Sequence, residues 1–113
     1  MQKKSEIKLE VQLDDKNIPE QILWQASDHP DGAGKQECKA VLLSLFDMER
    51  GDTLKIDLWT KDMQVIEMDR LVYQTLRSLA DSYATATNNL RMANEMQKFA
   101  QFFGEETEII KRP

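Results

Sequence analysis

The chain has 113 residues, of which 41% are hydrophobic and 31% are charged, and its formal net charge is −5. Its length suits one domain, and its composition is that of a globular protein rather than of a low-complexity or fibrous chain. The excess of acidic over basic residues argues against a nucleic-acid-binding surface and against a polybasic contact with anionic lipid.

Cysteine content and hydropathy favour the cytoplasm. Cys38 is the only cysteine, so an internal disulfide is excluded, and a single thiol suits a reducing compartment. The first residues show no apolar core of a signal peptide, and no apolar run reaches the length of about 18 residues that a membrane-spanning helix needs. We therefore expect a cytoplasmic protein without direct membrane insertion.

Two segments near the N-terminus have the alternation of a strand. Residues 6–13 and 21–27 alternate between opposite faces, and the first of them is strictly apolar on one face and polar on the other. Residues 14–17 between them are turn formers, and Pro19 stands where a strand could begin. The short connection favours a hairpin.

The next segments complete a set of four strands. Residues 28–36 are rich in glycine and proline and predict a loop. Residues 37–47 are apolar at both odd and even positions, which indicates a strand buried on both faces or a short helix, and the length favours the strand. Residues 53–59 alternate again, with a tight turn at Gly51 before them.

From about residue 63 the apolar period becomes that of a helix. The first stripe is Met68, Leu71, Val72, Leu76, Leu79, Ala80 and Tyr83, and the second is Met92, Met96, Phe99 and Phe103. Asp62 is the expected N-cap of the first helix, and Asn88 or Asn89 is expected to end it or to cap the next. Gly104 is the expected end of the second helix.

These elements predict an α+β fold in one domain over residues 1–113. A four-stranded antiparallel sheet occupies residues 5–59, and two helices over residues 63–104 pack on one face of it, in the order ββββαα. Residues 105–113 form a charged tail. Because an open sheet has two edges that must be covered, homo-oligomerisation is a further expectation.

The sequence offers little for catalysis or metal binding. His29 lies between Asp28 and Asp31, but a metal site needs three or four ligands, and a solvated turn histidine is the better interpretation. Cys38 has no neighbour that marks it as a nucleophile. Phosphate-binding glycine loops and nucleophile elbows are absent from the sequence. We expect no catalytic residue, no metal site and no cofactor, and hence no enzyme.

Two tryptophans are the candidates for binding a protein partner. Trp24 and Trp59 lie at the ends of the second and fourth predicted strands, and parity places Trp59 on the face that carries Lys55 and Asp57. A tryptophan exposed on a sheet face is a common interface anchor. The alternative is that the strand ends at Leu58 and Trp59 is covered by the first helix. The methionines near the helices are interpreted as core rather than as a binding surface.

The sequence resembles a known family. The main motif is the stretch LKIDLWTKDM from Leu54 to Met63. Further matches are Ser5–Ile7, Leu13–Asp14, Pro19–Glu20, Trp24, Ala26, Glu67–Met68, Gln74–Leu76, Ser78–Asp81 and Ala84–Thr87. These residues, spread over positions 5–103, resemble the gliding-motility protein family GldC.

The resemblance implies a cytoplasmic accessory protein of the gliding apparatus of Bacteroidetes, which is associated with a dedicated protein-secretion system. The family brings no catalytic residue and no cofactor with it. The expected function is therefore that of a non-enzymatic subunit with partners in the gliding or secretion machinery. The order of elements is also that of the export chaperone SecB, so a holdase for unfolded or exported clients is the alternative; fold alone does not decide between them.

Overall fold

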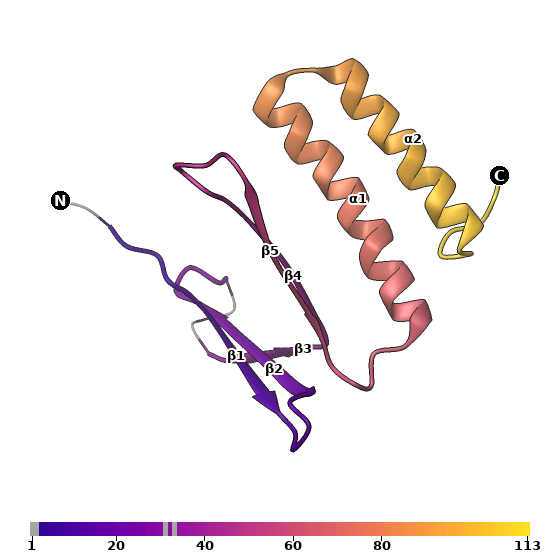
Figure 1. Cartoon of the computed structure of the whole chain (residues 1–113). Coiled ribbons are helices and arrows are strands. Elements are labelled where there is room, and N and C mark those ends of the chain that lie inside the picture. Colours follow the sequence, from indigo (N-terminus) through magenta and orange to yellow (C-terminus); the bar gives the residue numbers. More distant parts are fainter. Residues whose placement is uncertain (1–2, 31, 33) are drawn as a thin grey trace. The chain divides into compact units, whose positions relative to one another are not determined.

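The computed structural model describes residues 3–30, 32 and 34–113, and over these residues the chain forms strands followed by a helical hairpin (Figure 1). The elements are β1 (Ile7–Leu13), β2 (Pro19–Ala26), β3 (Gln36–Cys38), β4 (Ala40–Phe46), β5 (Thr53–Trp59), α1 (Val65–Thr87) and α2 (Leu90–Glu106). The chain divides into two compact units, residues 1–63 with the strands and residues 64–113 with the helices. Each unit is described by itself.

The hairpin of β1 and β2 follows from its turn and its alternation. The Asp14 carboxylate accepts hydrogen bonds from the backbone N–H groups of Lys16 (2.8 Å) and Ile18 (3.0 Å), which folds the connection of residues 14–18 back on itself. Asn17 adopts the left-handed conformation that the turn requires, with φ of 62°. The antiparallel register then sets each apolar residue of β1 opposite one of β2; Leu9, for example, faces Trp24.

The expectation of a single four-stranded sheet is wrong, because the predicted strand over residues 37–47 is interrupted at Lys39. Before the break β3 pairs with β2, and after it β4 pairs with β5. The described strands thus form a three-stranded sheet in the order β1–β2–β3 and a two-stranded sheet of β4 and β5. The helical alternative for this segment is wrong as well. Apolar residues at both parities indicated burial, but they carry no information on which neighbour a strand pairs with.

Backbone hydrogen bonds continue across the break between the two sheets. Thr60 N–H donates to the carbonyl of Lys39 (2.8 Å), and Lys61 N–H donates to the carbonyl of Pro19 (3.1 Å). The segment that leaves β5 therefore bridges the bend at Lys39 and the start of β2. Thr60 is buried at this corner, and Ile22 of β2 is buried opposite Cys38 of β3.

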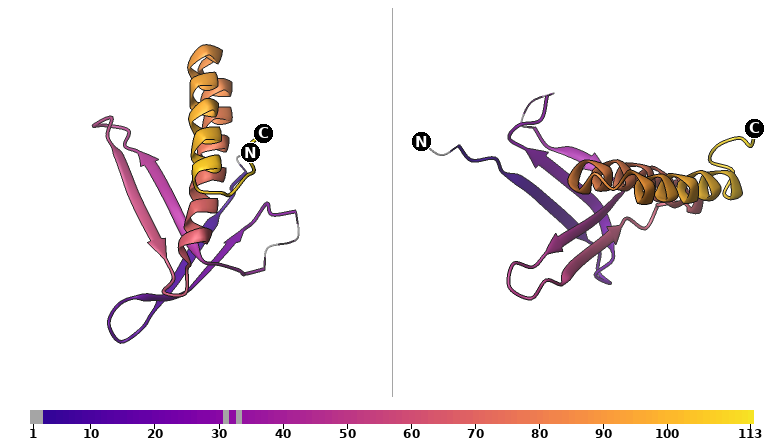
Figure 2. Two further views of the ribbon diagram at one scale, coloured as in Figure 1. Left: turned by 90° about the vertical axis from the view of Figure 1, so that its right-hand side faces the viewer. Right: turned by 90° about the horizontal axis from the view of Figure 1, so that it is seen from above.

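The helices run antiparallel in a hairpin (Figure 2), and their ends differ in part from expectation. The N-cap of α1 is Gln64 rather than Asp62; the backbone N–H of Gln64 donates to the Glu67 side chain (3.0 Å), and Asp62 instead accepts a hydrogen bond from the Thr60 hydroxyl. Asn88 ends α1 in the left-handed conformation, and the Asn89 side chain accepts from Met92 N–H at the start of α2. The predicted roles of the two asparagines are confirmed.

Small residues let the two helices approach closely. The buried seam of the hairpin consists of Tyr73, Ala80, Ala93, Ala100 and Gly104. The two residues of α1 are seven positions apart and those of α2 are seven and four apart, which keeps each set on one face of its helix. Gly104 lies inside α2 rather than at its end, because α2 continues to Glu106. A Cβ atom at Gly104 would lie 2.6 Å from Cε1 of Tyr73, so the glycine makes room for the aromatic ring.

The C-terminal segment folds back onto the end of α2. The carbonyl of Gly104 accepts hydrogen bonds from the backbone N–H groups of Ile109 (2.9 Å) and Ile110 (3.1 Å). Glu108 has a φ of 62°, and this left-handed residue produces the reversal. Residues 107–110 thus close the helix C-terminus and satisfy one of its free carbonyl groups.

Candidate partner-binding surface

Trp59 and its charged neighbours share one face of the two-stranded sheet. β5 runs through Trp59, so the alternative in which the strand ends at Leu58 is wrong. The register pairs Trp59 with Ala40, Asp57 with Leu42 and Lys55 with Ser44. Leu54, Ile56 and Leu58 point to the opposite face. Trp59 remains 51% exposed.

The charges on this face neutralise each other. Lys55 Nζ lies 3.2 Å from Asp57 Oδ1 and donates to the Ser44 hydroxyl at 3.0 Å. Both charged side chains are more than one third exposed, so the pair contributes little to the stability of the chain itself. Its effect is to present a polar but locally neutral patch next to the indole of Trp59.

A second aromatic residue, which the sequence pattern did not indicate as a candidate, belongs to the same face. Phe46 pairs with Thr53 at the far end of β4, and its parity is that of Ser44 and Ala40. It is largely exposed. We call this surface, made of Ser44, Phe46, Lys55, Asp57 and Trp59, the β4–β5 outer face. Phe46 could be assigned to this face only once the pairing of β4 with β5 was known, because alternation within β5 does not say which residues of another strand lie on the same face.

Trp24 lies in the other sheet and does not join Trp59. It is half-buried between Leu9 of β1 and Gln36 of β3, which are its register partners. Its ring meets that of His29 edge to face, with 5.0 Å between the centroids and 70° between the planes. Trp24 therefore has a packing role on the three-stranded sheet, and the two tryptophans do not form a common row.

His29 and Cys38 have different neighbours in the structure. His29 Nδ1 lies 3.4 Å from the side-chain nitrogen of Gln36, whereas Cys38 stands opposite Ile22 in the ladder. Burial raises the pKa of the Cys38 thiol, which disfavours the thiolate. Within the described part of the chain, groups of three or more His, Cys, Asp or Glu side chains able to hold a metal ion are absent; Asp31 lies outside the described residues.

A three-way ion pair ties the first turn to the segment after β5. Lys61 Nζ lies 3.0 Å from Glu20 Oε1 and 3.3 Å from Asp14 Oδ2. Hydrogen bonds from the backbone of Ile18 and Lys16 lower the pKa of the Asp14 carboxyl, and the bonds to Glu20 and Asp14 raise the pKa of the Lys61 ammonium. These three residues hold the corner of the strand unit together, and we call them the Lys61 clamp.

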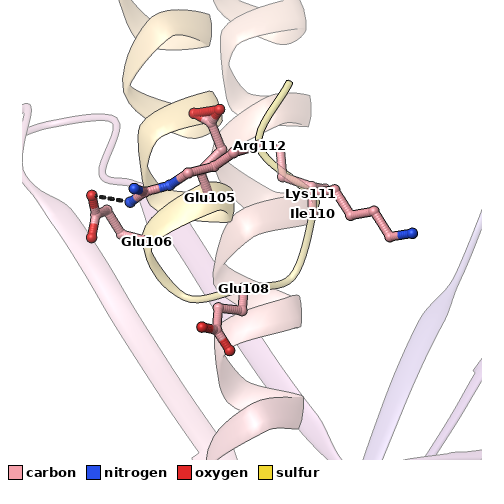
Figure 3. Close-up of a pocket in the computed structure, with 6 residues that line it drawn as sticks. All are labelled: Glu105, Glu106, Glu108, Ile110, Lys111 and Arg112. Carbon is pink, nitrogen blue, oxygen red and sulfur yellow. Dashed lines mark hydrogen bonds and ion pairs between the residues drawn. The ribbon is translucent and has the colours of Figure 1, made fainter.

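A hollow of about 600 Å³ lies at the C-terminal reversal. Its lining is Glu105, Glu106, Glu108, Ile110, Lys111 and Arg112 (Figure 3). Arg112 pairs with Glu106 at 2.5 Å. The hollow is open and mostly polar, its acidic and basic side chains are mixed, and it lacks the apolar enclosure of a small-molecule site.

These observations describe an α+β protein in which two exposed aromatic residues, Trp59 and Phe46, share one face of the two-stranded sheet. Among the residues described, no helix combines the length and the hydropathy needed to cross a membrane. The sequence model of the family described as "Gliding motility-associated protein GldC-like" matches residues 19–109. The chain belongs to this GldC-like family, which confirms the resemblance found from the sequence. No curated protein and no solved structure matches the chain.

Proposed function

We propose that the protein is a non-enzymatic accessory subunit that supports gliding motility and its associated secretion machinery in the cytoplasm, by binding a protein partner through the β4–β5 outer face. The observation that carries the proposal is the half-exposed Trp59 on a regular strand, in a chain of the GldC-like family. Because Trp59 lies in a strand, its backbone is already ordered before binding, which lowers the conformational cost of using the indole as an interface anchor.

The composition of the face supports a protein partner over a small molecule. Two exposed aromatic residues, Trp59 and Phe46, stand at opposite ends of the face, and the Lys55–Asp57 pair lies between them. Aromatic anchors with intervening polar groups are typical of protein interfaces. Among the hollows described, none is lined by a residue of this face, and small substrates usually bind in an enclosed hollow.

A crosslinked pull-down of the tagged protein from its native cells, read by quantitative mass spectrometry, tests the proposal. We expect one gliding or secretion component in near-stoichiometric amount. Trp59→Ala should weaken that interaction by about thirtyfold, as truncation of a tryptophan hot spot does, and should leave the thermal unfolding midpoint unchanged within the range of ordinary surface substitutions.

Met48→Ala is the matched control, because Met48 is 97% exposed in the β4–β5 turn and lies outside the proposed face. It should retain the partner at wild-type strength. A Trp59→Ala protein that folds normally and keeps every partner at full strength would show that the anchor is wrong.

The alternative function is a holdase, and one feature of α2 favours it. Met92, Phe99 and Phe102 are exposed there, and the Phe99 ring centroid lies 6.0 Å from that of Phe102. Such an apolar, adaptable surface can hold unfolded segments. A holdase suppresses the aggregation of unrelated proteins and recovers a broad, substoichiometric set of clients in the pull-down, whereas a dedicated subunit does neither.

A further inference from the structure

The outer edge of β1 is open over the whole strand. Among the described residues β1 pairs only with β2. Ser27 N–H donates to the carbonyl of Glu6, so the backbone N–H and C=O groups of Glu6 point toward β2. In an antiparallel ladder, successive residues point their backbone N–H and C=O groups alternately toward and away from the neighbouring strand. The backbone groups of Lys8 and Glu10 therefore also point toward β2, and those of Ile7, Leu9 and Val11 point away from it.

This edge carries few of the devices that normally block pairing with another strand. β1 contains no proline, and its register irregularity comes only at its end, between Gln12 and Leu13. Ile7 is 77% exposed and Leu9 42%. A seven-residue strand with exposed apolar side chains and outward backbone groups is a template for a further strand.

The charges on β1 select a second copy of the same strand as the occupant. Lys8 and Glu10 flank Leu9 on the face opposite to its side chain. In an antiparallel pair of two copies related by a twofold axis at Leu9, Lys8 of each copy stands opposite Glu10 of the other. Shifting the axis to Lys8 opposes two lysines, and shifting it to Glu10 opposes two glutamates, both of which are unfavourable across a ladder.

We propose that the protein forms a homodimer in which the β1 strands of two copies pair antiparallel about a twofold axis at Leu9. In this register the outward groups of Leu9 meet those of Leu9 in the second copy, and those of Ile7 meet Val11, which gives about six backbone hydrogen bonds between the chains. The two three-stranded sheets become one continuous six-stranded sheet. The apolar row of β1 meets its own copy on the same face.

Existing contacts of the two charged residues are compatible with this register. Glu10 lies 3.0 Å from Lys35, and Lys8 lies 3.9 Å from Glu6; all four side chains are about half exposed or more. A carboxylate accepts from more than one cation. Lys8 and Glu10 can therefore reach across the ladder without leaving a buried charge.

Charge exchange tests the proposed pairing, with sedimentation equilibrium over a range of concentrations as the readout. The wild-type chain should be dimeric. Lys8→Glu and Glu10→Lys should each raise the dissociation constant of the dimer about tenfold or more, because each places two like-charge pairs in the interface. The double variant Lys8→Glu with Glu10→Lys should restore the dimer. An equimolar mixture of the two single variants should form a heterodimer.

Lys98→Glu on α2 makes the same change of charge away from β1 and should not affect dimerisation. A monomer at all concentrations, or a dimer that neither single variant weakens, overturns the proposal, and a double variant that fails to dimerise overturns the register. Trp59→Ala should leave the dimer intact, so failure of the dimer and failure of the proposed partner site are separate results.

Disulfide crosslinking gives an independent measure of the register. In a Cys38→Ser background, Leu9→Cys should crosslink two chains on mild oxidation, because opposed residues of a ladder lie within the Cα separation that a disulfide spans. Val11→Cys should not, since the two copies of Val11 would be about 14 Å apart along the strands. Crosslinking at Val11 in place of Leu9 would contradict the axis at Leu9.

Discussion

At the scale of the residue, Gly104 shows how one absent side chain sets the distance between two helices. Gly104→Ala would bring its Cβ within 2.6 Å of Cε1 and 2.8 Å of Cδ1 of Tyr73. Overpacking of this kind costs about 1–3 kcal/mol, and the better helix propensity of alanine returns at most about 1 kcal/mol. We expect a net loss of about 1–2 kcal/mol in the free energy of unfolding, measured by urea denaturation.

Gly34→Ala is the control for this substitution. A Cβ at Gly34 meets nothing within 4 Å, and Gly34 is not in the left-handed region, so stability should change by less than about 0.5 kcal/mol. If Gly104→Ala is instead as stable as the wild type, the ring of Tyr73 moves aside at no cost and the seam is not close-packed at this point.

At the scale of the element, the Lys61 clamp makes the joint between β2 and the segment after β5 sensitive to pH. The lowered pKa of Asp14 means that the unfolded chain, with a pKa near the ordinary 3.8, binds more protons than the folded one in acid. The stability that the Asp14 carboxylate contributes is therefore fully present above pH 3.8 and is lost as the pH falls through the lowered pKa of Asp14 in the folded chain. Asp14→Asn keeps the hydrogen-bond acceptor but cannot take up the proton, so its free energy of unfolding should fall less steeply between pH 5 and acid.

Lys61→Met separates the two causes of the lowered Asp14 pKa, which are the backbone hydrogen bonds and the contact with Lys61. The backbone hydrogen bonds to Asp14 are the larger cause, so this variant should keep most of the acid dependence. It should lose the alkaline dependence, because the raised pKa of Lys61 gives stability that is present below 10.5 and is lost as the pH rises through the folded value. Urea denaturation series on the acid and alkaline sides check both slopes. An Asp14→Asn slope in acid equal to that of the wild type would contradict the assignment.

The elements themselves were largely predictable, because periodicity reports which side of a segment is apolar. The alternation in residues 6–13 and 53–59 and the helical spacing after residue 63 place strands and helices where the structure has them. Parity predicted that Leu54, Ile56 and Leu58 share one face of β5, and their partners in β4 share that face. The expectation that this row points into a core is not met, because Leu54 and Ile56 remain exposed. Parity also placed Trp59 beside Lys55 and Asp57, which is why part of the candidate surface was accessible from the sequence.

What the sequence did not reveal depends on contacts between distant residues. The interruption at Lys39 comes from a change of pairing partner, with Thr60 and Lys61 bonding across the corner. Glycine often ends a helix, yet Gly104 lies inside α2, where the ring of Tyr73 leaves no room for a Cβ atom. Gln64 outcompetes Asp62 as a cap because Glu67 lies three residues beyond it and accepts from its backbone N–H.

At the scale of the whole molecule, the helical unit of residues 64–113 is short and its buried seam is small, so neither feature accounts for a stable unit. The residues buried in α1 and α2 are one tyrosine, three alanines and one glycine. Large apolar side chains are exposed on the same helices, among them Leu79, Phe99 and Phe102. A unit of this size is marginal even with a well-formed core.

We therefore predict that residues 64–113 produced alone show less than about half of the helicity of α1 and α2 in the structure, since isolated helices depend on tertiary packing rather than on propensity. Far-UV circular dichroism at 222 nm, scaled per helical residue and followed through a thermal melt, measures this. The fragment should melt gradually, without a cooperative transition. Trifluoroethanol should restore the helices of the fragment, because their local propensity and the Asn89 cap are unchanged. A fragment that is fully helical and melts cooperatively without alcohol would show that the alanine and glycine seam is sufficient, and the exposed phenylalanines would then be free for a partner without any cost to the fold.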